Sequence, residues 1–144
     1  MKKIYLLIFL IGVLVVAGCS SNQPTNTQAV QDKQNSVSDK KANTIEMTSS
    51  GFSPNELKIK QGDKVTWANK DKVGHWPASA VHPTHEKYPG SSITKCNTPE
   101  QSGIFDACKN VNPSESWSFT FNEKGTWFYH DHSNAKLFGK IIVE

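Results

Sequence analysis

The amino-acid sequence predicts a small all-β sandwich over residues 44–144. No long stretch of this region repeats its apolar residues with the period of an α-helix. Short runs of strand-forming residues occur instead, and each is bounded by Gly, Pro, Asn or Asp. Residues 117–121 alternate large aromatic with small polar side chains, which is the pattern of a half-buried strand. Short strands with frequent turns are typical of sandwiches and barrels.

Each predicted strand is a short segment of β-branched, aliphatic or aromatic residues with alternating polarity. In chain order the segments are Thr44–Thr48, Glu56–Ile59, Lys64–Asn69, residues 117–121, residues 126–129 and residues 140–143. Tight turns are expected at residues 61–63 (QGD) and 122–125 (NEKG), where turn-forming residues cluster. The large aromatic residues of these strands, such as Trp67, Trp117 and Trp127, are expected to form the core.

Residues 77–113 form a connection that is too long for a plain sandwich, and connections of this length are usually functional or disordered. The segment contains Cys96 and Cys108. Outside the cytoplasm such a pair is expected to form a disulfide, which argues for an ordered loop. The alternative is that one of the two cysteines binds a metal as a thiolate.

The N-terminal residues predict a secretory signal. Lys2 and Lys3 precede an apolar run at residues 4–17, which is shorter than the roughly 20 residues of a membrane-spanning helix. The run ends in VAGC, which resembles the lipobox of bacterial lipoproteins. That resemblance implies cleavage before Cys19, a lipid on this cysteine and anchoring at the extracytoplasmic face of the cell membrane. An ordinary signal peptide with a chance cysteine is the alternative.

Three regions follow from this pattern: a lipoprotein signal peptide at residues 1–18, the lipidated Cys19 with a flexible tether to residue 43, and one domain at residues 44–144. The tether is expected because residues 20–43 are polar and contain almost no large apolar side chain. Without residues 1–18 the formal net charge falls from +3 to +1, since two of the sixteen basic residues are lost. A nearly neutral protein without a basic stripe argues against nucleic acid as a partner.

The histidines are the main functional signal. His130 and His132 follow a predicted strand with one residue between them, so their side chains point the same way if the strand continues. His75 stands at the end of another strand-like run. Converging imidazoles suit Cu, Zn, Ni or Fe better than Ca or Mg, and these three histidines are the first predicted ligands. Surface histidines at a strand end are the alternative.

Four further residues belong to the predicted site. His82 and His85, in the sequence HPTH, lie in the loop that begins directly after His75, and they either complete one metal site or build a second. Asp131 is expected to point away from its two histidine neighbours and to support ligands from behind at best. Asp106 is a candidate for orienting a ligand histidine through its other ring nitrogen, with capping of a turn beside the disulfide as the alternative.

Two blocks of the sequence resemble known copper proteins. GFSPNELKIKQGDKVTWANKD, at residues 51–71, resembles the N-terminal strands of cupredoxins of the plastocyanin and amicyanin type. The closing block from Tyr129 onward resembles the cupredoxin copper loop. The resemblance implies a Greek-key β-sandwich, copper as the cofactor and electron transfer as the activity. It places His75 and His132 at the two histidine ligands of the family.

The same resemblance has two departures. Tyr129 and His130 stand in the neighbourhood of the copper-binding cysteine, and Leu137 stands at the axial methionine. Blue copper sites need the thiolate, so these positions predict no blue site. The run GTWFYHDH, at residues 125–132, also resembles a histidine motif of multicopper oxidases. Their trinuclear cluster needs eight histidines from two domains, and this chain has five.

The sequence therefore predicts an extracytoplasmic, membrane-anchored protein with a non-blue, histidine-rich copper site, with zinc as the alternative metal. Electron transfer or copper handling is the expected role, with a redox or copper-donor protein as the partner. Two alternatives remain open. One is a copper-dependent oxidoreductase, of the oxidase, dismutase or nitrite reductase type, that acts as an oligomer. The other is a metal-free scaffold domain.

Overall fold

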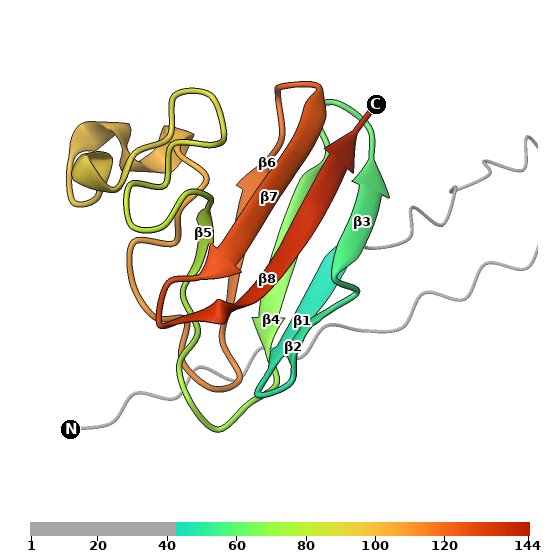
Figure 1. The fold of residues 1–144 in the computed structure, drawn as a ribbon, viewed down its shortest axis with the longest axis vertical. Helices are drawn as coiled ribbons and strands as arrows, with labels where there is room; N and C mark the ends of the chain where they lie inside the picture. Colours follow the sequence, from blue (N-terminus) through green and yellow to red (C-terminus); the bar gives the residue numbers. More distant parts are fainter. Residues whose placement is uncertain (1–42) are drawn as a thin grey trace, which may run out of the picture. The chain divides into compact units, whose positions relative to one another are not determined.

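Two four-stranded sheets face each other in the computed structural model, which describes residues 43–144 (Figure 1). The first sheet has the order β2 (Gly51–Ser53), β1 (Thr44–Thr48), β4 (Lys64–Asn69) and β6 (Ser116–Thr120). The second has the order β3 (Glu56–Ile59), β8 (Asn134–Val143), β7 (Gly125–Asp131) and β5 (Pro77–Ser79). Within these residues there is no α-helix, so the predicted all-β sandwich is confirmed.

The expectations for the signal peptide, for Cys19 and for almost all of the tether fall on residues 1–42, which lie outside the described residues. Within residues 43–144, no helix is long and apolar enough to span a membrane.

Both sheets are mixed. β1 pairs in parallel with β4, and β3 pairs in parallel with β8, whereas the other neighbouring strands run antiparallel. The first sheet therefore joins the N-terminal strand to β4, and the second joins β3 to the C-terminal strand. β7 lies between β8 and β5, so a residue of β7 has a neighbour on each side.

The structure extends two predicted strands and adds two others. β7 continues to Asp131, and β8 begins at Asn134, so a tight turn at residues 132–133 joins them. The first half of β8 carries little strand signal in its residue types, because Asn134 and Lys136 are weak strand formers. Pairing with β7 decides the conformation there. The added strands β2 and β5 have three residues each.

The core is mainly aromatic and includes residues from the long loop. Trp67 is fully buried and packs against Phe105, Phe121 and Tyr129, with ring centroids 5.3, 6.2 and 5.4 Å away. Phe105 comes from the connection between β5 and β6, so this connection supplies part of the core. Trp117 and Trp127, which the sequence assigns to the core, are only partly buried and pack against its edge.

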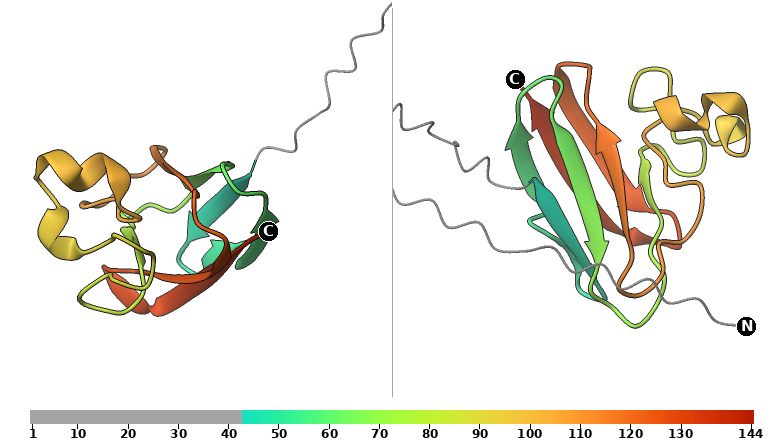
Figure 2. Two further views of the ribbon diagram at one scale, coloured as in Figure 1. Left: turned by 90° about the horizontal axis from the view of Figure 1, so that it is seen from above. Right: turned by 180° about the vertical axis from the view of Figure 1, so that it is seen from behind.

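The connection between β5 and β6 is ordered and lies beside β5 (Figures 1 and 2). It carries two short 3-10 helices, η1 (Ile93–Lys95) and η2 (Pro99–Gly103). The predicted disulfide between Cys96 and Cys108 is present, with a Cα–Cα distance of 5.3 Å. The buried Tyr88 ties the connection to the β6–β7 turn, because its hydroxyl accepts hydrogen bonds from the Asn122 and Glu123 amides.

Candidate metal centre

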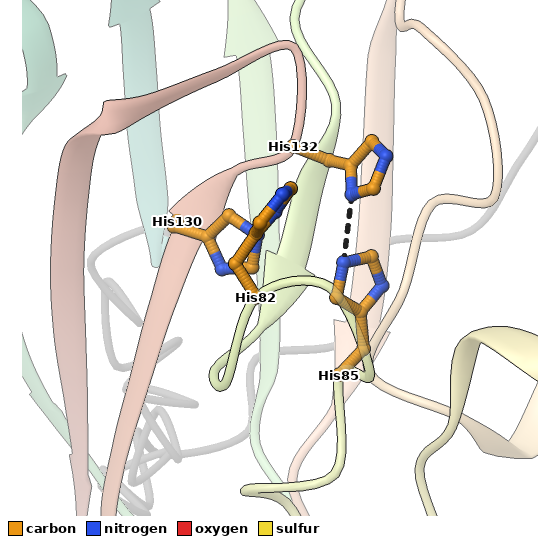
Figure 3. Close-up of side chains that lie close together, drawn as sticks. All are labelled: His82, His85, His130 and His132. Atoms are coloured by element: carbon orange, nitrogen blue, oxygen red, sulfur yellow. Dashed lines mark hydrogen bonds between the residues drawn. The ribbon is translucent and has the colours of Figure 1, made fainter.

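Four histidines from two parts of the chain converge on one point (Figure 3). His82 and His85 come from the loop after β5, His130 lies on β7, and His132 follows directly after β7. One ring nitrogen from each lies within 4.8 Å of those of the other three. Nδ1 of His82 is 3.2 Å from Nε2 of His130, and Nε2 of His85 is 2.8 Å from Nδ1 of His132. The loop and the β7–β8 hairpin together build the group.

The spacing of these nitrogens fits a single metal ion. Imidazole nitrogens bind zinc at about 2.0–2.1 Å, so tetrahedral ligands of such an ion lie roughly 3.4 Å apart. Two of the nitrogen pairs, at 2.8 and 3.2 Å, are near that spacing, and all pairs lie within 4.8 Å. The donor set consists only of imidazoles, which suit copper and zinc and disfavour calcium and magnesium.

The β7–β8 hairpin aims two of the four side chains. Alternation along β7 sends Tyr129 into the core and His130 to the other face of the sheet. The pairing of β7 with β8 shifts register between His130 and Asp131, and His132 then leaves the strand. The amide of His132 donates to the carbonyl of Trp76 at 2.7 Å. This bond fixes the end of the hairpin beside Trp76, the residue that directly precedes β5.

The other two side chains come from a turn at residues 81–85. The amide of His85 donates to the carbonyl of Val81 at 2.7 Å, which closes the turn. His85 has a φ angle of 61°, in the left-handed region, where non-glycine residues pay about 1–2 kcal/mol. Its side chain is fully buried, whereas His82 is exposed. The turn therefore presents one ligand from inside and one from the surface.

Asp106 holds His85 in its orientation. Nδ1 of His85 lies 2.5 Å from Oδ2 of Asp106, and both side chains are buried. The position of Asp106 follows from pairing, because it lies opposite Ala78, which in turn lies opposite His130. Burial alone would raise the pKa of Asp106, but hydrogen bonds from His85 and Trp76 hold this pKa below its ordinary value. An ionised carboxylate only accepts, so Nδ1 of His85 carries the proton, and its unprotonated Nε2 faces the other histidines.

The alternative role expected of Asp106 is present as well. Its Oδ1 accepts a hydrogen bond from the amide of Cys108 at 2.7 Å, so the carboxylate also caps the turn beside the disulfide. Because the sulfur atoms of Cys96 and Cys108 are bonded to each other, neither offers a thiolate to a metal.

The surroundings favour neutral imidazoles. Burial lowers the pKa of His130 to about 4, and the neighbouring His85, His82 and His132 add to this effect. Burial and the same neighbours His85 and His82 lower the pKa of His132. Neutral imidazole is the form that binds metal ions, so His130 and His132 are in the metal-binding form near neutral pH.

His75, the fifth histidine, stands apart from this group. Its Nδ1 lies 2.7 Å from Oδ2 of Asp131, and its Nε2 lies 3.2 Å from Oδ2 of Asp71. The side chain is buried, and both ring nitrogens face carboxylates. Asp131 points away from the four histidines, as expected from strand alternation, and also accepts from the amides of Trp76 and Ser133. The structure thus brings together four of the five predicted histidines and gives His75 two carboxylate partners instead.

Sequence reasoning missed two residues near these groups. Asp71 lies four residues before His75, but nothing in its neighbourhood pointed to that contact. Trp76 donates from Nε1 to Oδ1 of Asp106 at 2.6 Å, and its ring lies 4.4 Å from that of His132. The signal for Trp76 in the sequence is its place directly after His75.

Comparison with known proteins places this arrangement in a family. Residues 39–144 match the family described as copper binding proteins of the plastocyanin/azurin type. The chain is a member of this family. It is therefore a cupredoxin, as the resemblance in its sequence implied.

Plastocyanins are among the relatives of this cupredoxin. The chloroplastic plastocyanin of Silene latifolia subsp. alba is 32% identical over 94 residues, which cover 64% of this chain and 52% of that protein. The chain thus spans about half the length of that relative. Plastocyanin of Solanum crispum is 30% identical over 94 residues, which cover 64% of this chain and 86% of that protein.

Solved structures show the same fold. A reduced Cu(I) form of an amicyanin mutant has a TM-score of 0.56 at 24% identity, over 72% of this chain and 83% of that one. The purple cupredoxin of Nitrosopumilus maritimus has a TM-score of 0.53 at 22% identity, over 70% of this chain and 98% of that one. At these identities the likeness extends to the fold alone.

Two copper-loop positions that depart from the family pattern lie against the core. Tyr129, near the expected place of the cysteine, is buried in the core and packs edge-on against Phe52 at 4.7 Å. Leu137, at the place of the axial methionine, is partly buried against the core. The histidine group of this cupredoxin lies on the other face of β7 from Tyr129.

Proposed function

We propose that this cupredoxin binds one copper ion through His82, His85, His130 and His132 as a non-blue centre. The observation that carries the proposal is the convergence of these four imidazoles, each with a ring nitrogen within 4.8 Å of the others. Membership of a copper-binding family supports copper as the metal. Copper held by imidazoles without a thiolate has the weak colour and the spectrum of a type 2 centre.

Copper is favoured over zinc on two grounds. Divalent copper binds a given set of nitrogen ligands more tightly than zinc does. The relatives are plastocyanins, and their family is described by copper binding. Zinc is kept as the competitor in the experiment below.

Electron transfer is the proposed role of the centre. Three of its four ligands are held in place: His85 by the carboxylate behind it, His130 by its strand and His132 by a backbone bond. A centre whose ligands are held in this way is suited to a change of charge with little movement. His82 is exposed, so a partner protein has access to one edge of the group. We place this exchange at the extracytoplasmic face of the membrane, with the chain anchored through a lipid on Cys19.

The test is a titration of the full-length, detergent-solubilised chain with Cu(II), followed by absorption and EPR, with Zn(II) as competitor. We expect one copper per chain, a type 2 spectrum and displacement of Zn(II). The double variant His130→Ala/His132→Ala should lose this binding. An intense thiolate-to-copper absorption band, or undiminished binding by the double variant, would contradict the proposed site.

The roles of electron transfer and copper handling are separated by a second measurement on the same samples. A centre for electron transfer keeps its copper through repeated cycles of reduction and reoxidation. Loss of the metal to a Cu(I) chelator at each reduction would instead favour copper delivery.

A further inference from the structure

Trp76 contacts both halves of the histidine group without being a ligand. On one side, its indole Nε1 donates to Oδ1 of Asp106 at 2.6 Å, and Oδ2 of the same carboxylate holds His85 at 2.5 Å. On the other side, its ring lies 4.4 Å from the ring of His132, whose amide donates to the Trp76 carbonyl at 2.7 Å. The residue thus links the loop ligand to the hairpin ligand.

We propose that Trp76 is a positioning residue that tunes the copper centre through Asp106 and His85. The inference rests on the proposed function, since it concerns the same four histidines. The tuning acts through two hydrogen bonds, in which the indole N–H of Trp76 and the Nδ1–H of His85 both donate to the Asp106 carboxylate.

The direction of the tuning follows from charge. A carboxylate that accepts the Nδ1 proton of a ligand histidine makes the other ring nitrogen a stronger donor to the metal. Oδ1 of Asp106 already accepts from Trp76 and from the amide of Cys108, and each donor draws negative charge away from Oδ2. The indole N–H therefore weakens the pull of Asp106 on His85. A weaker nitrogen donor favours Cu(I) relative to Cu(II).

Two substitutions should change the reduction potential in opposite directions. Trp76→Phe keeps an aromatic ring beside His132 but removes the N–H, so Asp106 should pull harder on His85 and the Cu(II)/Cu(I) reduction potential should fall. Asp106→Asn removes the negative charge, so the potential should rise and the affinity for Cu(II) should fall by about 10–100-fold. A role in packing alone gives no reason for shifts of opposite sign.

Trp127→Phe is the matched control. Its indole Nε1 also donates one hydrogen bond, to the carbonyl of Glu123 at 2.8 Å, but this bond lies in the β6–β7 turn and reaches none of the four histidines. The control therefore loses the same type of donor from a tryptophan that is likewise partly buried. Its reduction potential should equal that of the wild type.

The experiment has a metal-free arm and a copper arm, both on the full-length chain. In the metal-free arm, NMR of the imidazole nitrogens should show a shifted Nδ1–H resonance of His85 in Trp76→Phe and an unshifted one in Trp127→Phe. In the copper arm, voltammetry should give a lower potential for Trp76→Phe and a higher one for Asp106→Asn. An unchanged potential in Trp76→Phe, or a shift of the same sign in both variants, would overturn the role of Trp76 while leaving the copper site in place. Failure of the wild type to bind copper would overturn the proposed function and this role together.

Discussion

The five histidines differ in how many carboxylates contact their ring nitrogens. His75 has a carboxylate at each ring nitrogen, so it is held as part of the structure. His85 has a carboxylate at one nitrogen only, which leaves the other for a metal. The number of acceptors around each ring thus separates the structural His75 from the proposed ligand His85.

A prediction at the scale of the residue concerns His75→Gln. The buried Asp131 would lose a hydrogen-bond partner, so the free energy of unfolding should fall by about 2–3 kcal/mol. Copper stoichiometry should stay the same, because His75 is outside the group of four. Urea denaturation of the metal-free chain and a Cu(II) titration measure the two effects.

His82→Gln is the companion variant, with the reverse result expected. His82 is exposed, so stability should change by less than about 0.5 kcal/mol, whereas the affinity for copper should drop. Loss of copper in His75→Gln with unchanged stability would return His75 to the ligand set.

At the scale of the element, the sequence predicted strands where alternation is strong and missed them where pairing decides. The alternating run of β6 and the aromatic run of β7 were found from residue type alone. The first half of β8 was not, since only its register with β7 makes it a strand. The three residues of β5 are fixed in the same way, by β7 on one side and by residues of the long connection on the other.

The sequence predicted the parts of the candidate site that have local signals and missed the parts that depend on tertiary packing. The spacing of His130 and His132 and the short motif with His82 and His85 are local signals, so the sequence displays them. The separation of His75 from this group, and the contact of Trp76 with Asp106, depend on how distant segments pack. One-dimensional spacing carries no information on that packing.

The disulfide-bonded connection carries a prediction of its own. Replacing both cysteines in Cys96→Ser/Cys108→Ser removes a cross-link over 12 residues, and the free energy of unfolding should fall by about 2–3 kcal/mol. Affinity for copper should also fall, because the amide of Cys108 helps to hold Asp106. Chemical denaturation and Cu(II) titration test both statements.

Reduction of the wild type with a phosphine is the control for that variant, and it should lower stability by a similar amount. A double variant as stable as the wild type would show that packing of Phe105 and Tyr88 orders the connection without the cross-link.

At the scale of the whole molecule, one prediction concerns whether the protein is attached to the membrane. If Cys19 carries the lipid, Cys19→Ala should move the protein from the membrane fraction to the soluble extracytoplasmic fraction, since acyl chains supply the membrane affinity. Fractionation followed by immunoblotting measures this, with Cys96→Ser/Cys108→Ser as a cysteine-substituted control that should stay with the membrane. Retention of the Cys19→Ala protein in the membrane fraction would contradict lipid anchoring.

One peptide of β7 belongs to the core and to the histidine group at once. Tyr129 fills the interior, with its hydroxyl directly below Gly139, where an added Cβ would come within 2.5 Å. The next residue, His130, offers its ring to the group on the opposite face. Under the proposed function, the packing of this interior therefore affects the copper ligands as well as stability. A substitution that shifts Tyr129 is expected to shift the proposed ligand His130 through the peptide bond that joins them, so repacking of the core would also alter the metal centre.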